Sequence, residues 1–397
     1  MKIALLGHGT VGSGVYELIM KNRSHFKEVY GKEMDIERIL VNRLENYKHL
    51  PYNELFSNQF DDFKDLSVDV AIETIGGIEP AFDYVSHFLA KGVPVITSNK
   101  DLIAERGNLL TALAKANNTS IRYEASVGGG IPILKPLGEN LAGDRIIEIA
   151  GIVNGTTNYI LTKMNNDALN YNTALAMAQN LGFAEADPTS DVEGLDSVRK
   201  IAILTKIGLN IDVDWKSIPV EGITEIDSND IAFFNQEQLN VKLIGITKLT
   251  KDGIYCSVRP VLVDNTSKFA SIHNEYNAVR VQGESVGELM FTGKGAGQLA
   301  TATSVLGDLV DLILNTKIKI NKKLENKTLV RFFPDQADWI VKLTGVSSND
   351  IFDEHVSVSE DTHFMKFAEI NEEALIKKLK TLSSQLGCDH KYYLIYE

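Results

Sequence analysis

The strongest constraint on the fold is a glycine loop near the N-terminus, placed between an apolar run and a helical pattern. Residues 2–6 are mostly apolar and lead into Gly7, Gly9 and Gly12, which have G-x-G-x-x-G spacing, and helical spacing resumes at Val15. A strand, a glycine turn and a helix in this order present backbone amides and a helix dipole to a pyrophosphate. A tight structural turn is the alternative. The context favours a dinucleotide site formed by Gly7, Gly9, Thr10, Val11 and Gly12.

Short apolar runs alternate with helical patterns through the first third of the chain. Further strands are expected at 36–41, 68–72 and 93–97, and helices at 81–91 and 102–117. This alternation predicts an α/β fold with a doubly wound parallel sheet of the Rossmann type. We expect it to form a nucleotide-binding domain over residues 1–128.

The rest of the chain predicts two further domains. After the glycines at 128–130, strand-like runs mix with helices in an α+β pattern, which we assign to a substrate-binding, catalytic and dimerisation domain over 129–299. A helix at 300–318 is expected to return and complete the first domain. Residues 322–397 predict a small βαββαβ, ferredoxin-like module whose first helix lies at 335–343.

Charge and cysteine usage exclude several classes of function. The 397 residues have a net charge of −13, the wrong sign for neutralising the phosphates of nucleic acid or anionic lipid. Cys256 and Cys388 have no partner at metal-ligand spacing, so we expect neither a disulfide framework nor a zinc site. No long apolar run occurs. We therefore expect a cytoplasmic protein with a small-molecule substrate and no nucleic-acid or membrane partner.

The end of the second predicted strand bears on the choice of dinucleotide. An acidic residue there would bind the adenosine ribose hydroxyls, whereas an arginine would accept a 2′-phosphate. The chain has Val41-Asn42-Arg43, and the first carboxylate is Glu45. We therefore predict that NADP(H) is preferred, with Arg43 as the phosphate partner and NAD(H) as the second choice. A solvated surface arginine is the alternative.

Two places in the chain have candidate catalytic side chains. Lys100 follows the fourth predicted strand, at the sheet edge where ligands of open α/β sheets bind. Residues 185–200 hold five carboxylates and two cations. In a helix that begins near Asp191, Asp196 and Lys200 would be one turn apart on the same face. Surface lysines and a capped helix with a surface ion pair are the structural alternatives.

These segments together resemble the homoserine dehydrogenase family. From Ala178 to Lys200 the chain matches the family's pattern of glycine, aspartate and lysine without a gap. Residues 124–133, 151–159 and 293–297 resemble its other marked segments. One departure is Ala300, where the resemblance leads us to expect proline. The resemblance extends over roughly residues 1–320.

The resemblance implies the interconversion of L-homoserine and L-aspartate 4-semialdehyde with NAD(P), in threonine, methionine and isoleucine biosynthesis. It assigns the acid/base role to Lys200, a place at the nicotinamide to Lys100, and the orientation of a catalytic lysine to Asp191. These residue types suit the chemistry, because the developing alkoxide needs a proton and nearby positive charge. Carboxylates would bind the substrate's ammonium by charge-assisted hydrogen bonds.

The resemblance also assigns binding residues and an assembly. Substrate binding falls to Glu185, Asp196, Gly155 and Thr156, and further cofactor contacts fall to Thr97, Lys100, Gly182 and Gly297. A monovalent cation, Na⁺ or K⁺, is implied at a loop that binds largely through main-chain carbonyls, formed by Glu124, Val127, Gly129 and Ile131. The family further implies a homodimer.

The tail resembles an ACT domain, the regulatory module that binds amino acids in this pathway. Such modules generally have a glycine in the turn after the first strand, where backbone amides approach the ligand. Here that turn is Phe333-Pro334-Asp335-Gln336-Ala337-Asp338 and contains no glycine. We therefore predict a dimerisation or stability element with weak or absent inhibition by threonine.

Two other functions compete with this assignment. Another semialdehyde dehydrogenase, acting through a thioester, would need a nucleophilic cysteine. Cys256 lies in a strand-like run with no nearby histidine, so a buried structural thiol is expected. A non-catalytic NADPH-binding amino-acid sensor would need the glycine loop and the tail. Such a sensor would not require the four charged residues Glu185, Asp191, Asp196 and Lys200 together.

Overall fold

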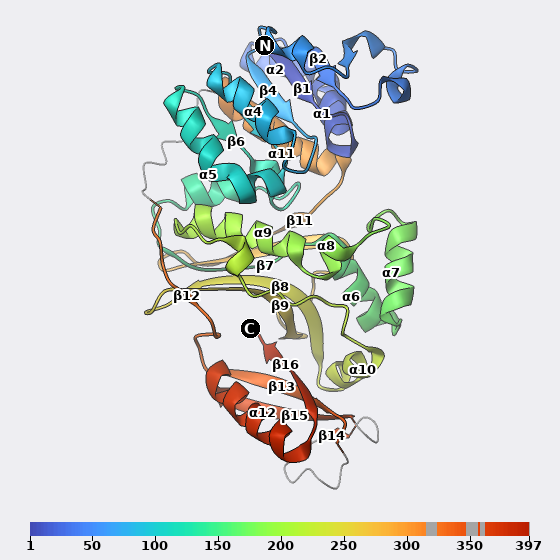
Figure 1. Ribbon diagram of the computed structural model, residues 1–397, viewed down its shortest axis with the longest axis vertical. Coiled ribbons are helices and arrows are strands. Elements are labelled where there is room, and N and C mark those ends of the chain that lie inside the picture. Colours follow the sequence, from blue (N-terminus) through green and yellow to red (C-terminus); the bar gives the residue numbers. More distant parts are fainter. Residues whose placement is uncertain (315–323, 347–355, 358–361, 397) are drawn as a thin grey trace. The chain divides into compact units, whose positions relative to one another are not determined.

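The computed structural model describes residues 1–314, 324–346, 356–357 and 362–396 (Figure 1). The chain divides into two compact units. Unit 1 consists of Met1–Arg145, Ala202–Asn210 and Phe291–Lys323, and unit 2 consists of Ile146–Ile201, Ile211–Met290 and Leu324–Glu397. The three expected domain ranges stay predictions. The end of the helix expected at 300–318 and the first residues of the expected tail domain lie outside the described residues.

Unit 1 is built on a parallel sheet with the strand order β3-β2-β1-β4-β5-β6. The strands are β1 (Lys2–Leu6), β2 (Asp35–Leu40), β3 (Phe56–Ser57), β4 (Val70–Glu73), β5 (Val95–Thr97) and β6 (Ile121–Arg122). Their central residues are apolar because helices cover both faces, as parallel sheets require. The expected doubly wound α/β fold is confirmed.

Helices from distant parts of the sequence cover this sheet. On one face, α1 (Thr10–Lys21) and α11 (Gln298–Ile313) contribute core residues such as Val15 and Leu309. On the other face, α4 (Ala81–Ala90) and α5 (Lys100–Ala116) contribute residues such as Phe88 and Leu110. The remaining helical segments of unit 1 are α2 (Arg23–Tyr30), η1 (Leu44–Tyr47), η2 (Asn53–Leu55), α3 (Asp61–Lys64), η3 (Glu124–Ser126), η4 (Pro136–Asn140) and η5 (Thr205–Leu209).

Unit 2 is built on a mixed sheet whose order is β11-β10-β7-β8-β9-β16-β13-β15-β14, with β12 also paired to β9. The first strands in sequence are β7 (Ile146–Ile152), β8 (Leu239–Leu249), β9 (Ile254–Asp264), β10 (Tyr276–Gly283) and β11 (Gly287–Lys294). The later strands are β12 (Leu329–Val330), β13 (Ala337–Thr344), β14 (Val356–Ser357), β15 (Thr362–Ile370) and β16 (Asp389–Ile395).

The helices of unit 2 include the one expected to hold Asp196 and Lys200. They are α6 (Gly155–Asp167), α7 (Tyr171–Asn180), α8 (Thr189–Val192), α9 (Leu195–Leu204), η6 (Trp215–Ser217), α10 (Ser228–Gln236) and α12 (Glu372–Leu386). Helix α9 packs tightly on the sheet, because a Cβ on Gly245 of β8 would lie only 2.1 Å from Cγ1 of Ile201. This contact fixes the height of α9 above the strands.

The tail differs from the sequence prediction at residues 335–343. The helix expected there is wrong, because Ala337–Thr344 forms β13, which is antiparallel to both β15 and β16. Trp339, Val341 and Leu343 alternate into the core, as β-branched and aromatic residues do on a pleated strand. The described tail therefore consists of β12, β13, β14, β15, α12 and β16, and its strands continue the sheet of unit 2 through β9 (Figure 1).

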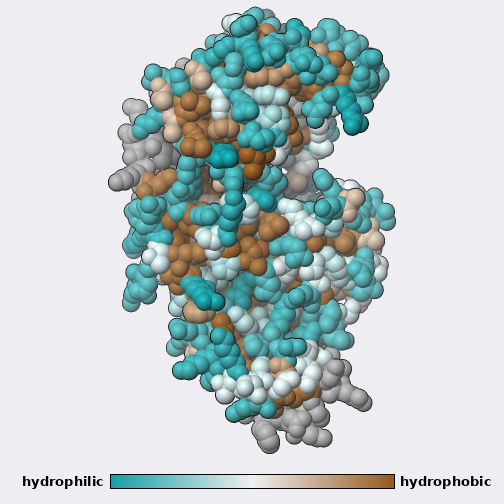
Figure 2. All heavy atoms as spheres, in the orientation of Figure 1, coloured by the Kyte–Doolittle hydropathy of each residue, from teal (hydrophilic) through white to brown (hydrophobic). Residues whose placement is uncertain are grey.

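The surface is largely hydrophilic on the face that Figure 2 shows, with hydrophobic residues in smaller groups. Large exposed hydrophobic side chains in the described ranges include Leu109, Leu181 and Leu314. No helix of the described residues is long and apolar enough to cross a membrane.

Candidate active site

The glycine loop connects β1 to α1. Gly7 has φ of +105°, and a Cβ there would lie 2.8 Å from the carbonyl carbon of Thr74. A Cβ on Gly12 would lie 2.1 Å from the Gly7 carbonyl oxygen. Gly9 is the N-cap of α1 and adjoins open space, because no atom lies within 4 Å of an added Cβ. The loop therefore fits a pyrophosphate at the positive end of α1, next to Thr10.

Thr97 and Lys100 lie at the carboxyl end of β5. Thr97 is fully buried and donates its hydroxyl hydrogen bond to the Glu73 carboxylate. Asn99 caps α5 by accepting from the Leu102 amide over 3.0 Å, so the half-buried Lys100 is the first residue of the helix. The order of β1, β4 and β5 places this corner on the same sheet edge as the glycine loop.

The other predicted cofactor residues of unit 1 occupy element ends. Arg43 is exposed and follows β2 at the start of η1. Gly297 has φ of +118° and is the N-cap of α11. Helix α11 thus begins at Gln298, and Ala300, the departure from the family pattern, lies inside its first turn.

Hydrogen bonds from neighbouring segments hold the loop that is expected to bind a cation. The Glu124 carboxylate accepts from the amides of residues 133–135 over 2.6 to 2.9 Å, and burial raises its pKa. The Gly129 carbonyl accepts from the Ser304 hydroxyl over 2.5 Å. In the part of the chain that the structure describes, no three His, Cys, Asp or Glu side chains are grouped as a metal site requires. A cation here would therefore depend on carbonyls, including those of Val127 and Ile131.

In unit 2, a polar cluster forms around Asn154, the residue before α6. Its side-chain oxygen caps the helix by accepting from the Thr157 amide over 2.9 Å. Its side-chain nitrogen donates to Asp191 Oδ1 over 2.7 Å and to Asp196 Oδ2 over 2.9 Å. Burial and the neighbouring Asp196 carboxylate raise the pKa of Asp191. Asn154 therefore holds two carboxylates next to each other.

Lys200 completes this cluster. Its Nζ donates to Asp196 Oδ2 and to the Val153 carbonyl, both over 2.7 Å. The side chains of Lys200 and Asp196 are only 12% and 6% exposed, so this is a largely buried ion pair. The structure thus brings Asp191, Asp196 and Lys200 together, as the spacing of the last two predicted.

The remaining predicted residues of unit 2 surround α6 and α7. A Cβ on Gly155 would lie 2.8 Å from the Glu275 carbonyl oxygen, so α6 begins in close contact with this loop. The Thr156 hydroxyl donates to the Phe183 carbonyl over 2.6 Å. Gly182 has φ of +76° after α7, and Glu185 is exposed. The Glu185 side chain is therefore exposed to solvent, and Glu185 precedes Asp191 by six residues in the sequence.

Sequence reasoning missed two residues of these sites. Asn154 lies in the family-like segment 151–159 and is not among the predicted site residues, although an asparagine before a helical pattern is a capping signal. Glu73 was not noticed, although it is 0% exposed. The only sequence signal for it is a carboxylate that ends an apolar strand shortly before Gly76 and Gly77.

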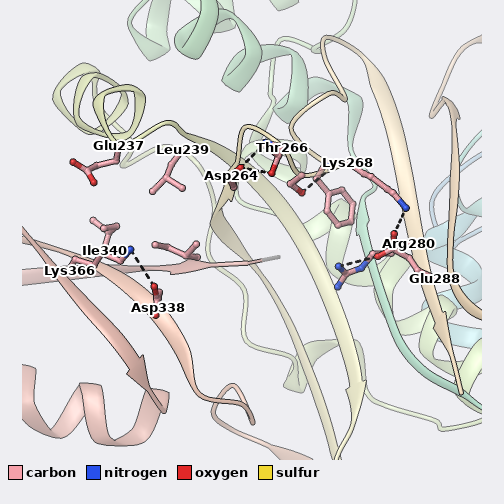
Figure 3. A pocket seen from close by; sticks show the side chains of 13 residues that line it. Glu237, Leu239, Asp264, Thr266, Lys268, Arg280, Glu288, Asp338, Ile340 and Lys366 are labelled. Carbon is pink, nitrogen blue, oxygen red and sulfur yellow. Dashed lines mark hydrogen bonds and ion pairs between the residues drawn. The ribbon is translucent and has the colours of Figure 1, made fainter.

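A cavity of about 530 Å³ in unit 2 does not contain the predicted residues (Figure 3). Its lining includes Lys268, Glu288, Asp338 and Lys366. These charges pair with each other, at 2.5 Å for Lys268 with Glu288 and 3.3 Å for Lys366 with Asp338. The Lys200 cluster is therefore the better candidate for the chemistry.

The cysteine required by a thioester mechanism is buried. Cys256 is 0% exposed in β9, where its Sγ lies 3.3 Å from the Thr247 hydroxyl. Cys388 is buried as well. The expectation of a buried Cys256 thiol is confirmed.

Comparisons with known proteins identify the family of this chain. A model of the homoserine dehydrogenase NAD-binding domain matches residues 7–124, and a model described as homoserine dehydrogenase matches residues 132–310. The homoserine dehydrogenase of Bacillus subtilis is 46% identical over 322 residues, which cover 81% of this chain and 74% of that protein.

Two solved structures extend the similarity to the fold. A homoserine dehydrogenase from Thiobacillus denitrificans has a TM-score of 0.89 at 30% identity, covering 100% of this chain and 98% of that one. A hyperthermophilic archaeal homoserine dehydrogenase in complex with NADPH has a TM-score of 0.66 at 26% identity, covering 82% and 99%. The chain therefore belongs to the homoserine dehydrogenase family, the NAD(P)-dependent oxidoreductases that interconvert L-homoserine and L-aspartate 4-semialdehyde.

Proposed function

We propose that Lys200 exchanges the proton of the reacting oxygen in this homoserine dehydrogenase. The observation that supports this most is the position of its Nζ, 2.7 Å from both Asp196 Oδ2 and the Val153 carbonyl. An ammonium anchored in this way is oriented and can give a proton to a substrate oxygen, and the neutral amine that remains can take a proton back in the reverse direction. The bound nicotinamide cofactor accepts or supplies the hydride.

Lys100 is the second cation of the proposed mechanism. It begins α5 at the carboxyl end of β5, which suits a residue next to a nicotinamide. A positive charge there would stabilise the alkoxide that develops on the substrate. Asp191 accepts from Asn154, and Asn154 holds Asp196, which in turn orients Lys200.

The substrate's ammonium is proposed to bind Glu185 and Asp196. Two carboxylates provide charge-assisted hydrogen bonds, which a substrate without the amine would leave unpaired. The backbone at Gly155 and Thr156 forms the start of α6, where amides suit the substrate's carboxylate.

This part of the proposal is tested with Glu185→Ala. The KM for homoserine should rise by about 10-fold or more, because one charged partner is lost, while the KM for the cofactor stays constant. Glu193→Ala is a matched control, since Glu193 is an exposed carboxylate of the same segment. An unchanged KM for homoserine would remove Glu185 from the site.

We infer that the cofactor binds to the glycine loop and that NADP(H) is preferred. Support comes from the open space next to Gly9 at the start of α1, from the exposed Arg43 after β2, and from the NADPH complex of the archaeal relative. Thr97, Lys100, Gly182 and Gly297 are proposed as further contacts. A monovalent cation is proposed at the carbonyls of Glu124, Val127, Gly129 and Ile131, which titration with K⁺ and Na⁺ would test.

For the tail, we propose an ACT-like stability or dimerisation element in a homodimeric enzyme. Support comes from β12 and β16, which both pair with β9, and from the buried ion pair of Arg259 with Glu372. Because the turn at residues 333–338 contains no glycine, L-threonine should inhibit weakly or not at all. Inhibition curves on the full chain test this, and strong inhibition would restore a regulatory role.

A further inference from the structure

Glu73 is a fully buried carboxylate in the middle of the proposed cofactor site. It ends β4, which lies between β1 and β5 in the sheet of unit 1. The segment after β4 therefore lies between the glycine loop, which follows β1, and the Lys100 corner, which follows β5. A charged group without solvent needs several donors, so its partners are informative.

The first partners of Glu73 belong to the turn that follows it. Its Oε1 accepts from the Ile75 amide over 2.7 Å and from the Gly76 amide over 3.3 Å. Gly76 and Gly77 both have positive φ, at +83° and +71°, so the backbone folds back toward the carboxylate. Glu73 thus fixes the shape of a turn at the carboxyl end of the sheet.

The other oxygen of Glu73 connects this turn to the Lys100 corner. Oε2 accepts from the Thr97 hydroxyl, and the Thr97 hydroxyl oxygen accepts in turn from the Asn99 amide over 3.0 Å. The Asn99 side chain donates to the Gly77 carbonyl over 2.6 Å and caps α5 at Leu102. Asn99, the residue before Lys100, is therefore held by two groups that Glu73 positions, the Thr97 hydroxyl and the Gly77 carbonyl.

The same turn also supports the glycine loop. The Thr74 amide donates to the Leu6 carbonyl over 2.7 Å, and its hydroxyl donates to the Gly7 carbonyl over 3.1 Å. An added Cβ on Gly12 would lie 2.7 Å from the Thr74 hydroxyl oxygen, so this side chain fills the space beneath the loop. One turn thus contacts the pyrophosphate end and the nicotinamide end of the proposed cofactor site.

We propose that Glu73 is a positioning residue that sets the spacing between the glycine loop and Lys100. It touches neither substrate nor the reacting atoms, and it acts through Thr74, Thr97 and Asn99. The inference rests on the proposed cofactor site. Loss of Glu73 should therefore weaken cofactor binding and turnover without changing homoserine binding, which falls to residues of unit 2.

The test compares Glu73→Leu with Glu73→Gln in steady-state kinetics of homoserine oxidation. Glu73→Leu removes all three acceptor contacts, so the KM for NADP⁺ should rise about 10- to 100-fold, while the KM for homoserine stays within about 2-fold. Glu73→Gln keeps an oxygen that accepts from the two amides, and its NH₂ group can donate to the Thr97 hydroxyl oxygen in place of the bond that Thr97 donates, so it should restore most of the affinity. Equal values for wild type and Glu73→Leu would overturn the proposal.

Two further variants separate positioning from stability. Phe63→Leu lowers stability in the core of unit 1 and should leave both KM values unchanged. Thr97→Val removes only the hydroxyl link and should raise the KM for NADP⁺ less than Glu73→Leu does. If Glu73→Leu does not fold, Asn99→Ala decides, because it breaks the bond to the Gly77 carbonyl without altering a proposed cofactor contact, and an unchanged KM for NADP⁺ then overturns the proposal.

Gly12→Val tests the cofactor site itself. If Gly12→Val impairs cofactor binding and the Glu73 variants do not, only the positioning role is wrong. If neither has an effect, the cofactor site is misassigned.

Discussion

Asp196 and Lys200 lie one helical turn apart on α9 and form a largely buried ion pair at 2.7 Å. The same Asp196 oxygen also accepts from Asn154, which has Asp191 as its second acceptor. The lysine is thus held by a chain of hydrogen bonds that begins at the cap of another helix. Removing any member would leave a buried polar group without its partner.

Replacement of Lys200 by alanine should lower turnover by about two to four orders of magnitude, the usual effect of losing an acid/base group. The KM for NADPH should change little. Lys163→Ala is the control, because Lys163 pairs with Asp167 on the outer part of α6. Turnover near that of the wild type in Lys200→Ala would contradict the mechanism.

Replacement of Arg43 by alanine should raise the KM for NADPH by about 10-fold and leave the KM for NADH unchanged, because only the 2′-phosphate loses a charged partner. Lys48→Ala, also exposed in unit 1, is the control for nonspecific loss of positive charge. Steady-state kinetics with both cofactors provide the measurement. Equal use of NADPH and NADH by the wild type would show that the assignment of Arg43 is wrong.

Replacement of Glu372 by alanine should lower the free energy of unfolding by about 3–5 kcal/mol, because it leaves Arg259 buried without its anion. Glu372 is 3% exposed, lies 2.6 Å from Arg259, and also accepts from the Phe333 amide. The neighbouring Glu373 is exposed, so Glu373→Ala should change stability by less than about 0.5 kcal/mol. Urea titrations that give equal free energies of unfolding for the two variants would show that the ion pair of Arg259 with Glu372 does not stabilise the fold.

Lys242 predicts a pH dependence of stability in the alkaline range. It is 3% exposed on β8, donates to the Ile272 carbonyl over 2.6 Å and to Asn158 over 3.2 Å, and lies near His273. Burial lowers its pKa to about 8, whereas the unfolded chain keeps a value near 10.4. The unfolded state therefore binds more protons between these values, and stability should rise with pH there, by up to about 3 kcal/mol.

Urea titrations at several alkaline pH values measure this effect as a difference between wild type and Lys242→Met. Other groups titrate in both proteins, so the difference isolates Lys242. Lys163→Met should keep the wild-type slope, because Lys163 has a carboxylate partner. Parallel slopes for wild type and Lys242→Met would show that the buried lysine does not titrate in this range.

Local patterns predicted β1, β2, β4 and β5 of unit 1, because each is a short run with buried apolar residues that is bounded by glycine or a polar turn, but they missed α2 and β3. The same approach failed at β13, where Trp339, Ile340 and Leu343 also fit a helical spacing. Residues 337–344 form a strand because they pair on one side with β15 and on the other with β16, and both partners come later in the chain. No local window contains that information.

The candidate site also combines features that local sequence predicts with features that depend on distant segments. The spacing of Asp196 and Lys200 predicted a shared helix face, and the ion pair lies there. Asn154 could be predicted as a cap, but its bonds to Asp191 and Asp196 join segments 37 and 42 residues apart. Glu73 depends likewise on Thr97, 24 residues away. Capping and spacing are local properties, whereas a buried carboxylate is explained only by the segments that surround it.

The pairing of β16 with β9 has a consequence for synthesis of the protein. Strand β9 is made long before β16, so part of its edge has no strand partner while the intervening residues leave the ribosome. An open, apolar strand edge is a template for pairing with other chains. Nascent chains of this enzyme should therefore be most prone to aggregation, and most dependent on chaperones, in the interval before Leu394 and Ile395 emerge.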